Sequence, residues 1–277
     1  MVLSAMLVFV TTDATAKFLA ASMSAQQIVS VRYGTIVFVL LPILLRNRSG
    51  SFRTSRPFLH LTRGLLLLVS SILFVFALED LPLELCTAIG FVAPLYVTAL
   101  SIPFLGEHVG VRRWAAVIIG FAGILIILQP GGSSFQWAML LPLASALCWA
   151  FGLIITRLMR GTELAMTILF YSSVAGWIVS IPLALPLWQS PTGFEWTLLI
   201  GLGAFNAIGQ YLIIRAFMLA SASLLAPFSY CSIVWAVLLG FVIFGSVPNL
   251  TTIAGTAVLI SAGLYVWHRE RVRAQVS

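Results

Sequence analysis

Long apolar runs separated by short polar connections fill almost the whole chain. A hydrocarbon core about 30 Å thick is crossed by roughly 20 apolar residues in a helix. Each run is long enough to cross once, and none alternates apolar with polar residues as a membrane β-barrel does. The pattern predicts an all-α integral membrane protein with ten transmembrane helices. The runs are 1–21, 26–45, 58–78, 84–105, 111–129, 135–156, 164–188, 195–218, 222–244 and 250–268.

Composition supports the same class. Of the 277 residues, 61% are hydrophobic and 8% are charged, whereas soluble domains carry about 25% charged residues. A water-soluble fold is excluded, and no length remains for a soluble domain beside ten spans. Residues 1–10 are apolar but have no basic segment before them and no cleavage site after them, so we interpret them as part of the first helix.

Basic residues gather in alternate connections. Cytoplasmic loops of membrane proteins hold the excess of Lys and Arg, so this distribution predicts a bacterial inner-membrane protein with both termini in the cytoplasm. The net charge of +7 then reflects topology, and no nucleic-acid partner is expected. The residues that agree with this orientation are Arg46, Arg48, Arg53, Arg56, Arg63, Arg112, Arg113, Arg157, Arg160, Arg215, Arg269, Arg271 and Arg273.

Several features recur at nearly one spacing, which predicts two halves, residues 1–130 and 131–277, with five spans each. An odd number of spans makes the second half enter the membrane from the opposite side, so the fold is expected to be two inverted five-helix repeats. The recurring pairs are Tyr33 and Tyr171, 138 residues apart, Gly106 and Gly245, 139 apart, and Gly123 and Gly263, 140 apart.

Two prolines stand inside the fourth and ninth runs. Pro94 and Pro227 each follow an alanine, and each precedes a tyrosine, Tyr96 or Tyr230. Proline kinks a helix and frees a carbonyl group. A freed backbone group at membrane depth must face protein or a water-filled cavity. We expect Pro94 and Pro227 to kink helices at a cavity wall, and kinks that serve packing alone are the alternative.

Three charged residues lie near the membrane interior at the start of the chain. Asp13 and Lys17 are four residues apart, so on a helix they share one face and can pair. A lone charge at mid-membrane costs about 2.5–3.5 kcal/mol on insertion scales. Asp13, Lys17 and Arg32 are therefore candidates for substrate binding, with proton coupling through Asp13 as a further hypothesis. A structural ion pair between the first two helices is the alternative.

Aromatic and amide side chains within other runs complete the candidate substrate site. Aromatic faces offer stacking area, and amides orient a ligand, so the set suits a planar amphipathic small molecule. Packing is the alternative for each aromatic residue taken alone. These candidates are Tyr33, Tyr96, Trp149, Tyr171, Asn206, Gln210 and Tyr230.

The segment 90–132 resembles the EamA family of the drug/metabolite transporter superfamily. The matching features are Pro94, Leu105-Gly106-Glu107, Arg112-Arg113-Trp114 and Gln129-Pro130-Gly131, with a second copy at Pro227, Tyr230 and Phe244-Gly245. Ser246 departs from the pattern, because the family usually has an acidic residue there. The resemblance implies a transporter with a central cavity between two repeats. Its members carry amino acids, nucleoside-like compounds, riboflavin and other metabolites in either direction.

The sequence therefore favours a secondary transporter of a small organic metabolite. No nucleotide-binding loop of the Gly-rich type is present, and the eight acidic residues and three histidines are scattered, so no metal or other cofactor is expected. A membrane-embedded enzyme and a non-transporting accessory subunit are the alternatives. The partners expected are the lipid bilayer and a small-molecule substrate, and the cargo, direction, coupling ion and oligomeric state stay open.

Overall fold

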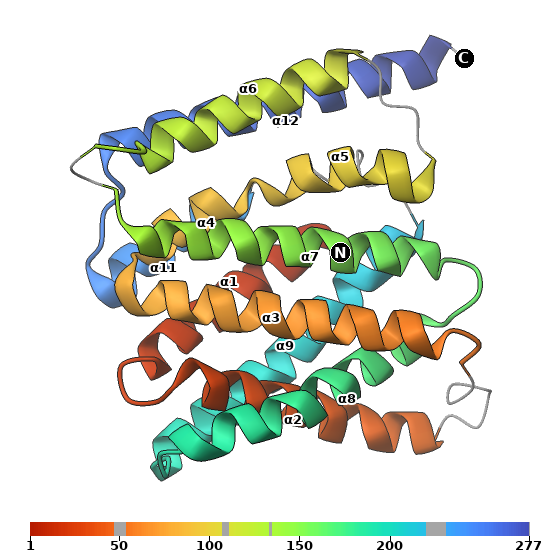
Figure 1. The fold of residues 1–277 in the computed structure, drawn as a ribbon, viewed down its shortest axis with the longest axis vertical. Coiled ribbons are helices and arrows are strands. Elements are labelled where there is room, and N and C mark those ends of the chain that lie inside the picture. The colour runs from red at the N-terminus through yellow and green to blue at the C-terminus, as the bar shows by residue number, and fades with distance from the viewer. Residues whose placement is uncertain (47–53, 107–110, 133–134, 220–230, 277) are drawn as a thin grey trace.

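The computed structural model describes residues 1–46, 54–106, 111–132, 135–219 and 231–276, with backbone alone for 111–113, 116, 263 and 266–276. Helices make up all the regular structure in these ranges, and no strand occurs there. Figure 1 shows them as a bundle. The helices are α1 (Val2–Leu19), α2 (Ala25–Arg46), α3 (Pro57–Asp80), α4 (Leu83–Gly90), α5 (Ala93–Leu105), α6 (Val111–Leu128), α7 (Leu140–Leu158), α8 (Ala165–Ala184), α9 (Gly193–Leu219), α11 (Cys231–Phe244) and α12 (Leu250–Val276), with short 3₁₀ turns at Trp137–Met139 and Leu185–Leu187.

The helices follow the apolar runs. In the described residues, seven helical stretches are long and apolar enough to cross a membrane, and Leu83–Leu105, which holds α4 and α5, is one of them. Three shorter apolar helices lie at Val117–Leu128, Cys231–Phe244 and Leu250–Ala262. The predicted all-helical class is confirmed in the described residues, and the long apolar helices support a multi-pass membrane protein. The first part of the ninth run lies outside the described residues.

The fourth run is broken rather than merely bent. Helix α4 ends at Gly90, α5 begins at Ala93, and Pro94 stands in the first turn of α5. Because Pro94 has no N–H, the carbonyl of Gly90 loses the donor that would continue the helix. The Thr98 hydroxyl donates to the Pro94 carbonyl at 2.9 Å. Pro227, the corresponding residue of the ninth run, lies outside the described residues.

The main helix contacts join the first half of the chain to the second. Helix α6 packs on α12, α2 on α8 and α4 on α11, while α3 packs on α7 and α8, and α9 packs on α1 and α2. Figure 1 shows α6 and α12 along one edge of the bundle, with α2 and α8 at the opposite edge. A Cβ added at Gly255 would lie 2.5 Å from the Gly123 carbonyl oxygen. Only glycine allows so close an approach, and close packing drives helix association in lipid.

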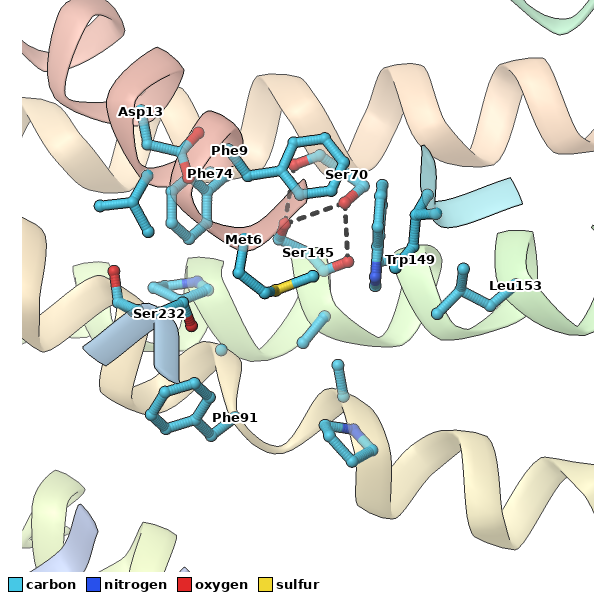
Figure 2. A pocket seen from close by; sticks show the side chains of 18 of the residues that line it. Met6, Phe9, Asp13, Ser70, Phe74, Phe91, Ser145, Trp149, Leu153 and Ser232 are labelled. Atoms are coloured by element: carbon cyan, nitrogen blue, oxygen red, sulfur yellow. Dashed lines mark hydrogen bonds between the residues drawn. The ribbon is translucent and has the colours of Figure 1, made fainter. Parts of the chain in front are cut away.

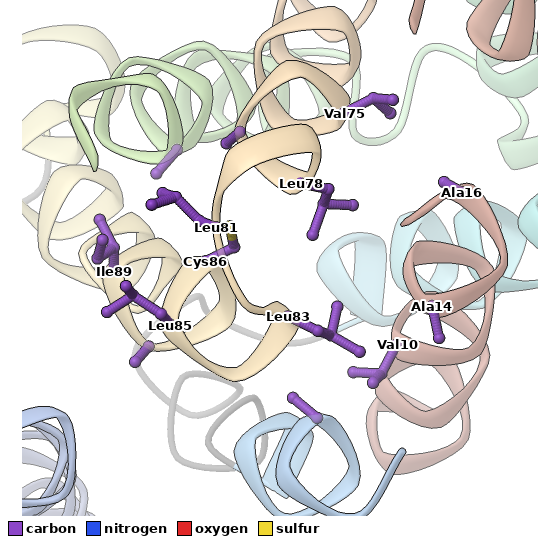
Figure 3. Packing of buried hydrophobic residues seen from close by; sticks show 14 of the residues in the cluster. Val10, Ala14, Ala16, Val75, Leu78, Leu81, Leu83, Leu85, Cys86 and Ile89 are labelled. Carbon is purple, nitrogen blue, oxygen red and sulfur yellow. The ribbon is translucent and has the colours of Figure 1, made fainter. Parts of the chain in front are cut away.

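A fully buried apolar cluster surrounds the turn between α3 and α4. Leu78, Leu81 and Leu83 have exposed fractions of 1%, 1% and 0%, and they pack in one cluster with Val10 and Ala14 of α1. Figure 3 shows Leu78 and Leu83 on the side of the turn that faces α1, and Leu81 on its other side. Since Val10 also lines the cavity described below, this cluster borders the cavity on the side where α3 ends.

Candidate functional site

A cavity of about 240 Å³ lies among α1, α2, α3, α4, α5, α7, α9 and α11. Its wall is mostly apolar and aromatic with a few polar groups, the composition typical of small-molecule sites. The polar and charged residues of the wall are Asp13, Arg32, Ser70, Ser71, Thr87, Thr98, Ser145, Asn206, Gln210 and Ser232.

Two opposite charges stand on the wall without pairing. Arg32 on α2 is 5% exposed, and its Nη2 is buried with no hydrogen-bond partner. Asp13 on α1 is half-buried and lies close enough to interact electrostatically with Arg32. Within the described ranges, the ion pair that forms within 4.0 Å is the one between His60 and Glu163. Asp13 and Arg32 therefore both line the cavity without forming an ion pair within 4.0 Å of each other.

Lys17 does not line the cavity. Its Nζ donates to the carbonyl oxygens of Leu78, at 2.8 Å, and Leu81, at 2.7 Å, and lies 5.6 Å from the centre of the Phe244 ring. The last carbonyls of a helix have no intrahelical donors and attract cations. The predicted pair between Asp13 and Lys17 is thus wrong, because the end of α3 offers Lys17 better partners than the carboxylate on its own helix.

Aromatic side chains form much of the remaining wall. The rings of Phe9 and Trp149 meet edge to face, with centroids 5.6 Å apart at 87°. Figure 2 shows Asp13 toward one end of the cavity and Trp149 toward the other. Phe91 lies across the cavity from Phe9 and Phe74. Ser70 and Ser145 exchange hydrogen bonds with each other's carbonyls, at 2.9 and 2.8 Å, which ties α3 to α7 beneath the aromatic groups.

Three predicted tyrosines lie away from the wall. Tyr33 is 6% exposed, and its ring lies 2.9 Å from where a Cβ at Gly176 would be. Tyr96 packs against the apolar core, and Tyr171 lies 5.4 Å from the His60 ring. Tyr230 lies outside the described residues. The cavity instead brings together, from the predicted set, Asp13, Arg32, Pro94, Trp149, Asn206 and Gln210.

The amides of Asn206 and Gln210 stand one turn apart on α9, 7% and 8% exposed. Behind them lies Arg63, which is 1% exposed and whose Nη2 donates to the Gln210 Oε1 at 3.5 Å. Arg63, which was counted among the basic residues that flank a cytoplasmic loop, is buried and points inward from the second turn of α3. Its position inside the apolar run 58–78 was the available signal, since a charge within a span marks a functional site.

A second polar cluster joins the α2–α3 and α7–α8 connections outside the cavity. The Glu163 carboxylate lies 3.6 Å from the His60 Nε2 and accepts hydrogen bonds from the Thr54 hydroxyl and the Ser55 N–H, both at 2.9 Å. Burial alone raises the pKa of Glu163, but these hydrogen bonds and His60 outweigh it and hold the pKa below its usual value. This cluster has no local signal in the sequence, because its members are about a hundred residues apart.

Comparisons with known proteins agree on one family. The profile described as "EamA-like transporter family" matches residues 1–129 and 136–267. A protein of Rickettsia bellii named S-adenosylmethionine uptake transporter is 32% identical, over 94% of this chain and 89% of its own. A protein of Rhizobium johnstonii named riboflavin transporter is 34% identical, over 87% of this chain and 80% of its own. One crystal structure shares the fold, with a TM-score of 0.67 over 94% of both chains at 18% identity.

Proposed function

Because the chain belongs to the EamA-like transporter family, we propose that it carries a metabolite with a planar aromatic ring and a zwitterionic amino-acid group, of the S-adenosylmethionine kind. Transport of a small organic molecule across a membrane is the function of the relatives that cover most of this chain. The proposal concerns which class of molecule enters the cavity.

The unpaired charges of Asp13 and Arg32 carry this proposal. An amino-acid group presents an ammonium and a carboxylate a few ångströms apart, which can bind a carboxylate and a guanidinium on one wall. The Nη2 of Arg32 is buried without a partner, and leaving a buried donor unsatisfied costs about 1–3 kcal/mol. Arg32 is one of the residues that line the cavity, so a shift of its guanidinium toward a cargo carboxylate would remove that cost.

The aromatic wall accounts for the rest of the cargo. Phe9, Phe74, Phe91 and Trp149 line the cavity, and their faces can stack on a purine and attract a sulfonium group. Riboflavin, the compound named for other relatives, has a planar ring but no amino-acid group. It would offer Asp13 and Arg32 hydrogen-bonding groups but no charged partners, so the charge arrangement favours the S-adenosylmethionine class.

Counterflow into proteoliposomes tests the cargo. Vesicles holding the purified protein and unlabelled S-adenosylmethionine should accumulate labelled S-adenosylmethionine. S-adenosylhomocysteine, which keeps the ring and the amino-acid group, should compete. Faster exchange of riboflavin than of S-adenosylmethionine would overturn the proposed class. Release of a chemically altered product without accumulation would support a membrane-embedded enzyme instead, and we propose that the chain has no catalytic role.

The proposed architecture is ten spans in two inverted repeats, 1–130 and 131–277, with both termini in the cytoplasm. The helix contacts support it, because several main contacts between described helices recur when each helix is exchanged with its counterpart in the other half. The α3–α7 contact corresponds to α9–α1, α3–α8 to α9–α2, and α5–α7 to α11–α1. Helices α5 and α11 also end alike, at Gly106 and Gly245 with φ of 65° and 66°. Impermeant labelling of single cysteines on both faces tests the orientation.

Polar contacts at corresponding helix ends fit alternating access. The His60–Glu163 cluster joins the starts of α3 and α8. At the starts of α2 and α9, the Gln27 side chain exchanges hydrogen bonds with the Gln189 backbone, at 2.7 and 2.9 Å. In an inverted repeat these two contacts lie on opposite faces of the membrane. Both contacts are formed in this structure, and we assign them to the closures at the two ends of the cavity.

A further inference from the structure

Arg63 is a buried cation that the proposed cargo site does not use directly. It is 1% exposed and is among the largest fully buried side chains of the described residues. None of the acidic groups in the part of the chain that the structure describes lies within 4.0 Å of its guanidinium. Burying an uncompensated charge costs several kcal/mol, and Arg63 instead contacts two neutral side chains, Thr156 and Gln210. A buried charge with this free-energy cost inside a membrane span indicates a specific function for the Arg63 guanidinium.

The contact with Thr156 fixes where the guanidinium lies. The Arg63 Nε donates to the Thr156 Oγ1 at 2.8 Å, while that hydroxyl donates to the Gly152 carbonyl at 2.8 Å. The hydroxyl hydrogen is therefore used within α7, and only an oxygen lone pair is left for Arg63. The guanidinium is held against α7 with its Nη2 directed toward α9.

The contact with Gln210 fixes which way the amide turns. A guanidinium has donors and no acceptor, so Gln210 must present its Oε1 to Arg63, and the distance is 3.5 Å. The amide nitrogen then points to the other side. Gln210 lines the cavity, and among the described residues its Nε2 has no hydrogen-bond partner, yet it is not one of the fully buried unpartnered atoms. The NH₂ group of Gln210 therefore borders the cavity.

We propose that Arg63 is a positioning residue that sets cargo specificity through Gln210. By holding the amide oxygen, Arg63 leaves the Gln210 NH₂ as a hydrogen-bond donor on this part of the wall. This NH₂ donates to a ring nitrogen or carbonyl oxygen of the cargo and disfavours a cargo group that is itself a donor. The inference rests on the proposed function only in that the cavity binds the transported molecule. Both S-adenosylmethionine and riboflavin carry ring acceptors, so either compound reports on it.

A double-mutant cycle tests the coupling. The KM for counterflow is measured with S-adenosylmethionine and, separately, with riboflavin in the wild type, R63M, Q210A and R63M/Q210A. Each single change should raise KM about tenfold, the equivalent of one lost hydrogen bond, with the maximal rate within about twofold. The double variant should match Q210A, because Arg63 acts through that amide. R63K keeps the charge but lacks the guanidinium donors that contact both Thr156 and Gln210, and it serves as a second variant if R63M folds poorly.

Arg56→Met is the matched control. Arg56 is exposed and donates to the Leu158 carbonyl at 3.3 Å, so this change also removes a cation that joins α3 to α7, but leaves Gln210 untouched, and KM should stay within twofold. Equal tenfold losses that multiply in the double variant would overturn the inference. So would an R63M protein with a lower melting temperature and an unchanged KM. If the protein exchanges riboflavin but not S-adenosylmethionine, the proposed cargo is refuted, and the double-mutant cycle is measured with riboflavin. If it exchanges neither compound, both the proposed cargo and the role of Arg63 are overturned.

Discussion

Replacing Asp13 with Asn is the most direct test of the cavity as a site for a zwitterionic cargo. Asn has nearly the same shape, so the cavity keeps its volume and its aromatic wall. What is lost is one negative charge that, among the described residues, neutralises no cation within 4.0 Å. If the cargo ammonium binds to Asp13, removing this charge weakens the binding of the ammonium.

The size of the effect follows from the arrangement. Two unit charges 4 Å apart attract by about 4 kcal/mol at an effective dielectric constant of 20, but both must first lose water. Hydrogen bonds to charged groups contribute about 1.5–3 kcal/mol net. Since 1.4 kcal/mol is a factor of ten, Asp13→Asn should raise the KM for S-adenosylmethionine by roughly 10- to 150-fold.

The assay is counterflow in proteoliposomes at neutral pH, with the KM taken from initial rates. Riboflavin, which has no ammonium, is the control cargo, and its exchange, if any, should change by less than twofold. An S-adenosylmethionine KM within twofold of the wild type would refute the proposed contact. The same variant tests proton coupling, because stimulation by an imposed pH gradient should vanish with Asp13, and stimulation that persists in Asp13→Asn removes this residue from that role.

Three further predictions concern stability, each read from thermal unfolding in detergent. Gly255→Val should destabilise the protein by about 1–3 kcal/mol, because the Gly123 carbonyl lies 2.5 Å from the added Cβ, whereas Gly201→Val, with nothing within 4 Å, should have little effect; equal losses would contradict the close α6–α12 contact. Ser246→Glu should lower the melting temperature more than Ser246→Ala, because the Ser246 hydroxyl donates to the buried Glu84 carboxylate at 3.0 Å and a second carboxylate would repel it; the reverse order would count against this contact. The pKa of Glu163 in the folded state lies below its unfolded value of 4.5, so the stabilisation by this carboxylate is present above pH 4.5 and is lost as pH falls through the folded-state pKa. The melting temperatures of the wild type and Glu163→Gln should therefore converge as the pH is lowered. A difference in melting temperature that stays constant with pH would refute the prediction.

The candidate site was predictable in type but only partly in membership. Asp13, Arg32, Asn206 and Gln210 were identified because polar residues inside apolar runs are expensive to leave facing lipid, and Trp149 because an aromatic face can stack on a ligand. That argument says a residue points inward, but not toward what. Tyr33 and Tyr171 also point inward, yet they pack between α2 and α8 and beside His60. A buried aromatic side chain and a cavity-lining one have the same signal in sequence.

The sequence by itself determined the helical class, the position of most described helices to within about five residues and the membership of a transporter family. These properties follow from the residues of each segment taken by themselves, because the free energy of placing a segment in a bilayer is mainly the sum of the contributions of its own residues. Only the tertiary structure decided that Lys17 binds the end of α3, 61 residues away, and that Arg63 holds Gln210, 147 residues away. Such partners depend on how far each helix is rotated about its axis against its neighbours, and that rotation is set by the packing of the whole bundle.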